Sequence, residues 1–588
     1  MKKVNKDKEF GIKEKLITEF NISKEVAEKL VVDYGADIVD IITDKPYILS
    51  RYLMPLEDVK QIIEKCSADK NEDYKNRNIV AAAIIYIIES MVKFEGQVFC
   101  YKSELEDKIK DLDEVVDKTK LGEALELLEN DNKIIRDKNK ERRECIYLSE
   151  LYKEEVELAK LITHFAEANK NYCCDITKIA EFMESYKPEC NELNKAQNEA
   201  LRMALISRIS IITGVAGSGK TTAIKAVVEG FKYLNQGNVQ LVSFTGRAVE
   251  RMTSVTGIQG STIHRLLGIG IDGTNNVSSV NADVLIVDEA GMIGIELFKM
   301  LLDSVKDNKN IKIVIVGDEF QLQSIAPGSV LKDLIKSGLV PVVCLKEIVR
   351  QEEKSIIVSN ARKIIEGNII DGKKSGVRIK KNEFEFIEID GESIKEKVLG
   401  VIDKLLKSGT SIYNIQVMSP LRKGINGIEE LNREIADRFN YIPERDIYKF
   451  AVVDPIMVGN NNYAKQIYNG QRGLITRVNN DIINGTELIT ADFFGREVIF
   501  NKNEIEGIEL SYASTFHKMQ GSEIPVAILV VDKAHEMMLN RELLYVGITR
   551  GVKRVILIGS KEAFNKCVKR VIRERNSLLA ERLVGMSS

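Results

Sequence analysis

Residues 214–222 read GVAGSGKTT, and this stretch decides the class of fold. It matches the pattern G-x-x-x-x-G-K-[ST], in which backbone N–H groups of a glycine-rich loop and of the following helix surround phosphate groups. The context fits, because the apolar run ISIIT precedes the loop and the helical stretch TAIKAVVEGF follows it. The stretch therefore predicts a P-loop α/β fold that binds and hydrolyses a nucleoside triphosphate. The expected nucleotide-binding residues of the loop are Gly214, Gly217, Gly219, Lys220, Thr221 and Thr222.

Two later strands end in residues that suit the same chemistry. The run VLIVDEAGM places Asp288 and Glu289 at the end of an apolar strand. There Asp288 would hold the water shell of Mg²⁺, and Glu289 would polarise the attacking water. Lys220 would neutralise the β- and γ-phosphates, and Thr221 would bind the Mg²⁺. A third strand ends in VGDEFQLQS, where the Gln321 amide is suited to contact the γ-phosphate or its water. The sequence thus predicts ATP and Mg²⁺ at this edge of the sheet.

From about residue 190 onward, apolar β-type runs alternate with helical or polar segments. This alternation predicts an α/β fold with parallel sheets, and two groups of runs predict two such units. The first unit is expected at residues 190–345, and the second at residues 346–444 and 510–588. Short strands and turns such as YNGQRG interrupt the second unit and predict a small inserted β-barrel at residues 445–509.

The region before residue 165 is predicted to be helical, because apolar residues recur at helical spacing in VAEKLVVDYGADIVDIITDKPYIL. Towards its end, a helix gives way to a short strand around Ile134, a charged tip RDKNKERRE and a second strand CIYL. A helix followed by a basic-tipped hairpin is typical of a winged helix. An ordinary solvated turn is the alternative interpretation.

The composition is that of a soluble globular protein, with 44% hydrophobic and 29% charged residues in a chain of 588. The net charge is −3, so positive charge for a nucleic acid would have to be local. The eight cysteines include no Cys-x-x-Cys pair, which disfavours a metal cluster and favours reduced thiols. We see no signal peptide and no run that could span a bilayer, so we expect a cytoplasmic protein without a membrane partner.

Four further stretches bear on whether the ATPase is a DNA motor, a switch or a kinase. LNKAQ precedes the P-loop, and the Gln197 amide is able to recognise the adenine edge of ATP. LLYVGITRG carries Arg550 in a predicted tight turn before a strand of the second unit, from which it could reach a γ-phosphate as an arginine finger. YASTFHKMQGSE and TIHRLL are polar clusters that contain His517 and His264. For each histidine, a purely structural role is the alternative.

A series of motifs in a fixed order resembles the RecD-like family of superfamily 1 DNA helicases. The resemblance covers about residues 190–560. It implies two RecA-like domains with ATP between them, single-stranded DNA across their top, a small inserted β-barrel and movement from 5′ to 3′. The motifs are LNKAQ, GVAGSGKTT, SFTGRAVERM, TIHRLLG, VDEAGM, GDEFQLQS, EIVRQ, SPLRKGINGIEELN, STFHKMQGSE and LLYVGITRG.

The resemblance also implies roles for individual residues. The implied ATPase site comprises Lys220, Thr221, Asp288, Glu289, Gln321, Arg350 and Arg550. The implied DNA-contact positions are Thr245, Arg247, Thr262 and His264 in the first domain, and Ser419, Thr515 and His517 in the second.

The N-terminal region resembles the helical extension of the same family. Residues 1–75 resemble a helix-hairpin-helix unit, in which FNIS replaces the usual glycine-containing hairpin, and residues 76–165 resemble a winged helix. Family members carry a duplex-splitting pin between TIHRLLG and the acidic strand. Here residues 271–279 contain DGTNN, which suits a hairpin turn and predicts such a pin, with a plain loop as the alternative.

Together these patterns predict an ATP-dependent DNA helicase or translocase that acts on single-stranded and tailed duplex DNA in repair or recombination. Two alternatives stay open. One is a DNA-stimulated ATPase that regulates repair without unwinding. The other is a P-loop kinase or switch that needs no DNA.

Overall fold

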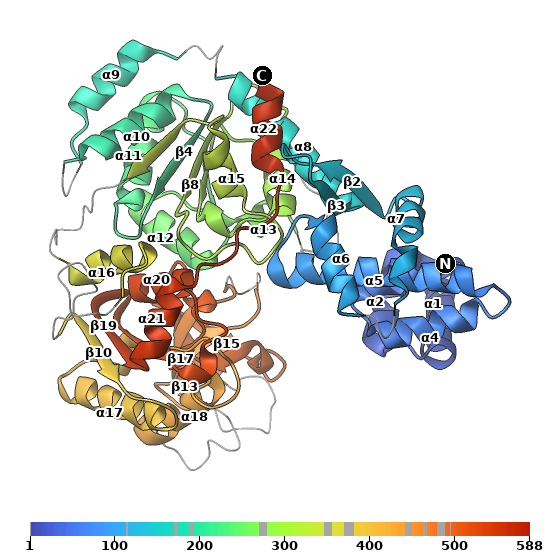
Figure 1. Ribbon diagram of the computed structural model, residues 1–588. Helices are drawn as coiled ribbons and strands as arrows, with labels where there is room; N and C mark the ends of the chain where they lie inside the picture. The colour runs from blue at the N-terminus through green and yellow to red at the C-terminus, as the bar shows by residue number, and fades with distance from the viewer. Residues whose placement is uncertain are drawn as a thin grey trace.

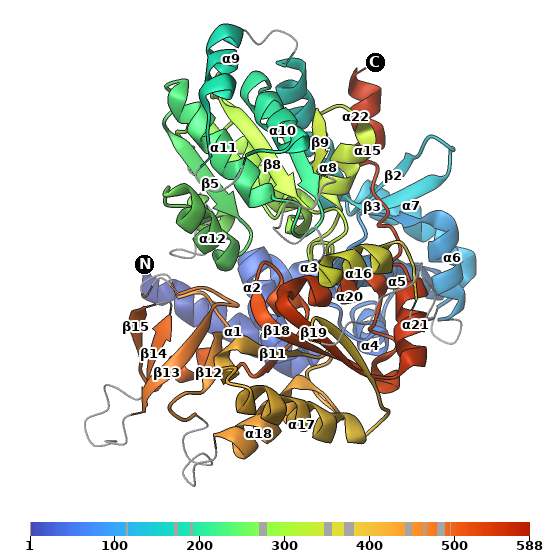
Figure 2. The same ribbon diagram turned by 90° about the vertical axis from the view of Figure 1, so that its left-hand side faces the viewer.

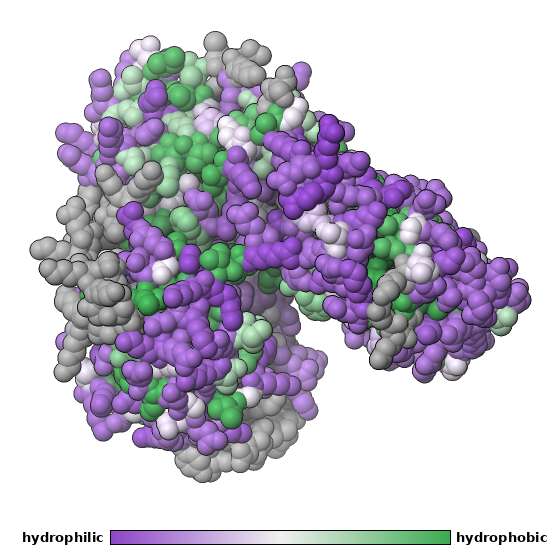
Figure 3. All heavy atoms as spheres, in the orientation of Figure 1, coloured by the Kyte–Doolittle hydropathy of each residue, from purple (hydrophilic) through white to green (hydrophobic). Residues whose placement is uncertain are grey.

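The computed structural model describes residues 2–112, 116–169, 174–188, 192–269, 279–345, 355–369, 382–440, 450–462, 465, 467–478, 489–493 and 495–587. Figure 1 shows two α/β bodies, one above the other, with the N-terminal helices in a separate lobe beside them. Hydrophilic residues cover most of the face drawn in Figure 3, with hydrophobic patches between them. Among the described residues, we find no helix whose length and apolar character would suit a membrane span.

The N-terminal lobe is helical, as predicted. Asn21 has a φ of 54° in the turn between its first two helices, a left-handed conformation that asparagine tolerates. Ser23 caps the second helix by accepting a hydrogen bond from Val26 N (3.4 Å). The stretch FNIS therefore turns the chain without a glycine. The helices are α1 (Lys2–Phe20), α2 (Lys24–Tyr34), α3 (Ile38–Asp44), α4 (Leu56–Cys66) and α5 (Glu72–Ser90).

A small three-stranded antiparallel sheet follows these helices, in the order β1-β3-β2. Strands β2 and β3 form a hairpin whose registered pairs run from Ile134↔Leu148 to Lys138↔Glu144. The order helix, strand, two helices and hairpin is the topology of a winged helix. Its elements are β1 (Cys100–Tyr101), α6 (Lys102–Lys110), α7 (Leu121–Asn130), β2 (Ile134–Lys138) and β3 (Glu144–Leu148).

The phosphate loop belongs to a six-stranded parallel sheet in the order β6-β5-β7-β8-β4-β9. Its apolar strands are buried on both faces, as all-parallel sheets require. Its strands are β4 (Ile209–Gly214), β5 (Val239–Ser243), β6 (Ser261–Thr262), β7 (Val284–Asp288), β8 (Lys312–Gly317) and β9 (Val342–Leu345).

Helices cover the two faces of this sheet in separate cores. One face carries α9 (Ile176–Ser185), α10 (Lys195–Ile206) and α11 (Lys220–Tyr233). The other face carries α8 (Ser149–Glu167), α14 (Ile295–Asp303) and α15 (Val330–Ser337).

A second parallel sheet has five strands in the order β10-β19-β18-β11-β17. The prediction of two parallel α/β units is therefore confirmed. The strands are β10 (Phe384–Glu388), β11 (Ile415–Met418), β17 (Ala513–Ser514), β18 (Ile524–Val531) and β19 (Gly551–Gly559). Helices α16 (Ile356–Ile365), α20 (Arg541–Arg550) and α21 (Lys561–Lys569) pack on one face, and α17 (Ser393–Lys407) and α18 (Ile428–Phe439) on the other.

An antiparallel sheet is inserted between α18 and β17, in the order β15-β14-β13-β12-β16. Figure 2 shows β12 to β15 side by side at one end of the lower body. Among the described residues β15 and β16 are the two edges and do not pair with each other. The inserted β-structure is thus present, and its closure into a barrel stays a prediction. Its strands are β12 (Pro455–Val458), β13 (Arg472–Val478), β14 (Ile489–Phe493), β15 (Arg496–Phe500) and β16 (Ile508–Leu510).

The last residues differ from the predicted assignment of 510–588 to the second unit. Helix α22 (Leu579–Ser587) packs against α8 and α15, which cover the first sheet. Figure 1 shows it in red beside the upper body. The reason is its apolar side, because Leu579 and Leu583 are buried in the core of the first unit. We call residues 570–587 the C-terminal segment below.

Candidate active site and DNA interface

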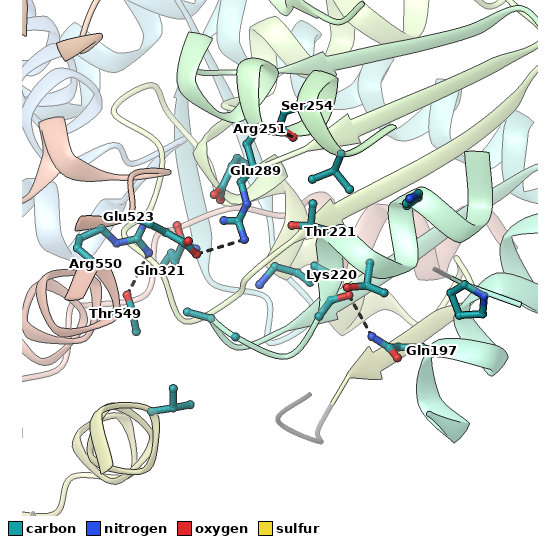
Figure 4. A pocket seen from close by; sticks show the side chains of 18 of the residues that line it. Gln197, Lys220, Thr221, Arg251, Ser254, Glu289, Gln321, Glu523, Thr549 and Arg550 are labelled. Carbon is teal, nitrogen blue, oxygen red and sulfur yellow. Dashed lines mark hydrogen bonds and ion pairs between the residues drawn. The ribbon is translucent and has the colours of Figure 1, made fainter. Parts of the chain in front are cut away.

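A cavity of about 610 Å³ lies between the two parallel-sheet units. The first unit contributes the phosphate loop, Gln197, Glu289 and Gln321. The second contributes Ile357 and Val358 of α16 and the end of α20. Figure 4 shows Gln197 and Lys220 at one side of this cavity and Arg550 at the other. The cavity is therefore bounded by both units, as a site for a nucleotide held between them requires.

The phosphate loop has the backbone that its glycines predict. Gly217 and Gly219 have φ values of 82° and 84°, which side-chain-bearing residues rarely adopt. A Cβ on Gly214 would lie 2.6 Å from Ser218 Oγ, so this position also needs glycine. Lys220 begins α11, and its Nζ donates to Gly214 O (2.6 Å) and Val215 O (3.2 Å). The lysine thus lies over the loop, where its charge would meet a phosphate. Thr221 and Thr222 line the same cavity.

Gln197 is held against the phosphate loop by its own helix cap. Asn194 caps α10, with Asn194 Oδ1 accepting from Gln197 N (2.8 Å) and Gln197 Oε1 accepting from Asn194 N (3.0 Å). The other end of the amide, Gln197 Nε2, donates to Gly219 O (3.3 Å). Gln197 thus links α10 to the loop and lines the cavity, and its contact with adenine stays a prediction.

The acidic pair ends β7 beside the loop. Asp288 Oδ1 accepts a hydrogen bond from Glu289 N (2.8 Å). Burial, and after it the neighbouring Glu289 carboxylate, raises the pKa of Asp288 above its ordinary value. Glu289 has a φ of 52°, a strained conformation for this residue type and one that is typical of functional sites. A cation beside the Asp288 and Glu289 carboxyl groups would stabilise the ionised form of both. Asp288 therefore suits a Mg²⁺ ion.

Gln321 follows β8 and also lines the cavity. Its side chain is buried, and its Oε1 has no hydrogen-bond partner among the described residues. A buried acceptor without a partner is costly, so the amide suits contact with a bound group in the cavity.

Arg550 reaches the cavity from the second unit. It is the last residue of α20, so the predicted tight turn is wrong; the helix runs up to β19. Its guanidinium donates to Val546 O (3.1 Å), Ser522 O (3.2 Å) and Thr549 Oγ1 (3.0 Å). Burial lowers the pKa of Arg550, and the Glu289 carboxylate acts in the opposite direction. The predicted Arg350 lies outside the described residues.

Sequence reasoning missed several residues at the cavity. Arg251 of α12 (Gly246–Thr256) forms an ion pair with Glu523 of the second unit (3.2 Å), drawn in Figure 4. Arg251 lies in the motif SFTGRAVERM and Glu523 in the motif STFHKMQGSE. Nothing in either motif indicates that the two side chains form an ion pair. Tyr545, within LLYVGITRG, was also missed; it does not line the cavity but contacts Ala216 of the phosphate loop.

The four predicted DNA contacts of the first unit lie around the carboxyl ends of β5 and β6. Thr245 caps α12 and accepts from Ala248 N (3.3 Å), and the buried Thr262 caps the short helix α13 (Ile263–Leu266). The His264 ring packs edge-on against Phe244, and burial lowers its pKa.

Arg247 is partly covered by the second unit. Its Nη1 donates to Ser522 Oγ of the second unit, and its Nε has no partner among the described residues. Burial, and after it the nearby Arg472, lowers the pKa of Arg247 to about 10. The second unit covers this guanidinium, so contact with DNA would require the two units to part there.

The three predicted contacts of the second unit share one edge of its sheet. Strands β11 and β17 are parallel neighbours, with Met418 opposite Ser514, so Ser419 and Thr515 lie side by side after them. Ser419 is fully buried and donates to Asn426 O (2.7 Å), and Thr515 Oγ1 accepts from Lys518 N (3.3 Å). His517 begins a short 3₁₀ helix (His517–Met519) in which Met519 is buried, and partial burial lowers the pKa of His517. Of the three, His517 is the one that solvent reaches most freely.

Comparison with known proteins agrees with this geometry. A family model described as an AAA domain matches residues 192–380, and one described as a UvrD-like helicase C-terminal domain matches residues 510–558. An ATP-dependent RecD2 DNA helicase of Deinococcus radiodurans is 32% identical over 398 residues, which cover 66% of this chain and 52% of that protein. Over the matched residues the chain is similar to RecD-like helicases. It spans about half the length of the Deinococcus relative.

Other RecD-like relatives match over a longer share of their length. The RecBCD enzyme subunit RecD of Buchnera aphidicola is 25% identical over 499 residues, covering 71% of this chain and 80% of that protein. Among solved structures, a Bacteroides Pif1 bound to single-stranded DNA is 19% identical, with a TM-score of 0.41, and covers 64% of this chain and 94% of that one.

Proposed function

We propose that this chain is an ATP-dependent DNA helicase that moves along single-stranded DNA from 5′ to 3′ and separates duplex DNA in repair or recombination. The observation that carries the proposal is the cavity between the two units. The phosphate loop and Glu289 line it from the first unit, and Arg550 lines it from the second. A site divided in this way couples nucleotide hydrolysis to relative movement of two units, which a motor needs. Similarity to RecD-like helicases supports the same activity.

Each residue of the cavity has a chemical role in this proposal. Lys220 and the loop N–H groups hold the phosphates, and Gln197 contacts the adenine. Glu289 orients the attacking water, Gln321 contacts the γ-phosphate end, and Arg550 stabilises charge that develops in the transition state. Arg350 is proposed to assist Arg550. Thr221 and Asp288 would hold Mg²⁺, which supplies charge neutralisation at the phosphates when it is bound.

The DNA would lie across the carboxyl edges of the two sheets. Thr245, Arg247, Thr262 and His264 are proposed contacts on the first unit, and Ser419, Thr515 and His517 on the second. Contacts to the DNA backbone would make binding tolerant of sequence and sensitive to salt. The substrates would be single-stranded and tailed duplex DNA, and the protein would act in the cytoplasm.

Three structural predictions belong to the same proposal. The inserted sheet would close as a small β-barrel, and the N-terminal lobe would serve as the family's helical extension. The predicted pin at residues 271–279 lies outside the described residues except for its last position. We propose that it separates the duplex mechanically without contacting ATP.

The first prediction is that single-stranded DNA accelerates ATP hydrolysis and that Lys220→Ala abolishes it, because the phosphates lose their cation. Steady-state turnover measured with and without an oligonucleotide tests this. Lys232→Ala is a matched control, since Lys232 is exposed near the other end of α11, away from the cavity.

Two outcomes would count against the proposal. Turnover that does not change when DNA is added would favour a DNA-independent P-loop NTPase. Full activity of Lys220→Ala, equal to that of Lys232→Ala, would show that the cavity is not where ATP is hydrolysed.

A further inference from the structure

Tyr545 extends from the second unit to the phosphate loop. It lies in α20 and is fully buried. Its hydroxyl accepts a hydrogen bond from Ala216 N (2.9 Å) and donates one to Asp318 Oδ2 (2.7 Å). Ala216 belongs to the phosphate loop, and Asp318 follows β8, so both partners lie in the first unit. One hydroxyl therefore joins two parts of the first unit to the helix that ends in Arg550.

The hydrogen bonds of this hydroxyl have a fixed direction. Asp318 is buried, its Oδ1 accepts from Phe320 N (3.0 Å), and its Oδ2 lies 3.9 Å from Lys220 Nζ. Burial, and after it the charge of Asp318, raises the pKa of Tyr545 well above its ordinary value. The hydroxyl therefore stays protonated and donates its proton to the carboxylate, while its oxygen receives the Ala216 N–H. Removing the hydroxyl would leave both groups of the first unit without this partner.

Another polar contact across the cavity is more exposed. The Arg251–Glu523 ion pair has side chains that are 47% and 37% exposed. Solvent screens such pairs, so they hold two bodies together only weakly. The Tyr545 contact is buried, and buried polar groups are costly to leave unpaired. It is thus better suited to fix how the second unit meets the phosphate loop.

Helix α20 carries both Tyr545, which contacts the first unit, and Arg550. Tyr545 and Arg550 lie five positions apart, and Arg550 donates to Val546 O (3.1 Å) within the same helix. We propose that Tyr545 is a positioning residue for ATP hydrolysis: its hydroxyl fixes α20 to the phosphate loop so that Arg550 faces the cavity. This inference rests on the proposed ATPase activity and deepens it, because it assigns the contact that aligns the two halves of the site.

Hydrogen–deuterium exchange of the nucleotide-free protein tests the contact directly. In Tyr545→Phe the ring stays and the hydroxyl is lost. We expect peptides that span the phosphate loop to exchange about tenfold faster, because Ala216 N–H loses its partner. Tyr512→Phe is the matched control, since Tyr512 is also buried and its hydroxyl donates to Asp454 Oδ1 (2.7 Å), just before β12 of the inserted sheet. It should leave exchange of the phosphate loop unchanged.

Steady-state kinetics then tests the positioning role. We expect Tyr545→Phe to lower kcat about tenfold while KM for ATP and affinity for ADP change by less than about threefold. A general loss of packing would lower the thermal stability of Tyr545→Phe and of Tyr512→Phe. It would not lower kcat selectively while leaving KM nearly unchanged. Tyr512→Phe should keep the wild-type kcat.

A second variant, Asp318→Asn, tests the same hydrogen bond in case Tyr545→Phe fails to fold. Asp318→Asn keeps an oxygen that is able to accept from Tyr545, so its effect should be milder. Because the two residues act through one hydrogen bond, the double variant should be little worse than Tyr545→Phe alone. Fully additive losses of kcat would overturn the coupling.

The remaining outcomes separate this inference from the proposed function. Unchanged exchange of the phosphate loop in Tyr545→Phe, or faster exchange with a wild-type kcat, would overturn the positioning role. Absence of ATP turnover in the wild-type protein would instead overturn the proposed function, and the positioning role with it, whatever the exchange data show.

Discussion

At the scale of single residues, the proposed site includes an arginine supplied from the second unit. Arg550 lines the cavity opposite Lys220 and Glu289, and its guanidinium is held by carbonyls of its own unit. We predict that Arg550→Ala lowers kcat about 10³-fold, since arginine fingers contribute that much or more, while ATP affinity changes little. Single-turnover hydrolysis and equilibrium binding of a nucleotide analogue measure the two effects separately.

Arg554→Ala is the control for Arg550. It removes a guanidinium four residues later, one that pairs with Glu385 (2.8 Å) in the second unit and does not line the cavity. Its kcat should stay near wild type. If Arg550→Ala weakened nucleotide binding and spared kcat, the finger role would be wrong.

The residues that could be predicted from the sequence are those that lie within a recognisable local motif. Lys220, Asp288 and Glu289 lie in a phosphate-loop pattern or at the end of an apolar strand, and parallel strands bring such ends to one edge. The contact of Tyr545 with Asp318 joins residues 227 positions apart, and nothing in either stretch signals it. Coverage of Arg247 by Ser522 likewise depends on how two units meet.

At the scale of elements, the C-terminal helix is joined to α8 by a buried carboxylate. Glu155 of α8 is fully buried and accepts from Ser577 Oγ, Leu578 N and Arg582 Nε, each at 2.9 Å. Glu155→Ala would remove this partner from the half-buried Arg582 and leave it paired with Asp137 alone (2.8 Å). Breaking such a pair costs about 3 kcal/mol or more, so we predict a lower denaturation midpoint and faster proteolysis within the C-terminal segment.

Glu157, on the same helix, provides the comparison. It pairs with Lys299 (2.7 Å), and its side chain is 52% exposed. Exposed pairs contribute at most about 1 kcal/mol, so Glu157→Ala should shift the midpoint little. Equal effects of the two variants on stability and proteolysis would contradict the claim that Glu155 holds the segment.

For most elements, the periodicity of apolar residues predicted whether the element is a helix or a strand. It did not predict which other element each one packs against. Apolar runs such as VLIVD and KIVIVG predicted the strands, because strands of a parallel sheet covered on both faces are apolar on both faces. Helix α22 is amphipathic, and that pattern shows which side is buried but not against which element. Its packing against α8 and α15, far away in the sequence, could not be read from local residues.

At the scale of the whole molecule, the C-terminal segment connects three parts of the chain. It leaves the second unit after α21 and runs past the first unit and the three-stranded sheet β1-β3-β2. Arg575 donates to Ala326 O (2.9 Å) and Gly328 O (2.7 Å) in the loop after Gln321, and Arg573 pairs with Glu104 (2.7 Å) of α6. Movement between the two units would therefore reach the N-terminal lobe through this segment.

The most direct test of the central claim is strand displacement on duplexes with a 5′ tail, a 3′ tail or blunt ends, with ATP hydrolysis followed in the same samples. We predict that the 5′-tailed duplex is separated, that the other two are not, and that Lys220→Ala separates none. ATP hydrolysis stimulated by every tailed DNA without separation of any duplex would contradict the helicase claim and favour a non-unwinding regulator. Separation of the 3′-tailed duplex alone would contradict the proposed direction.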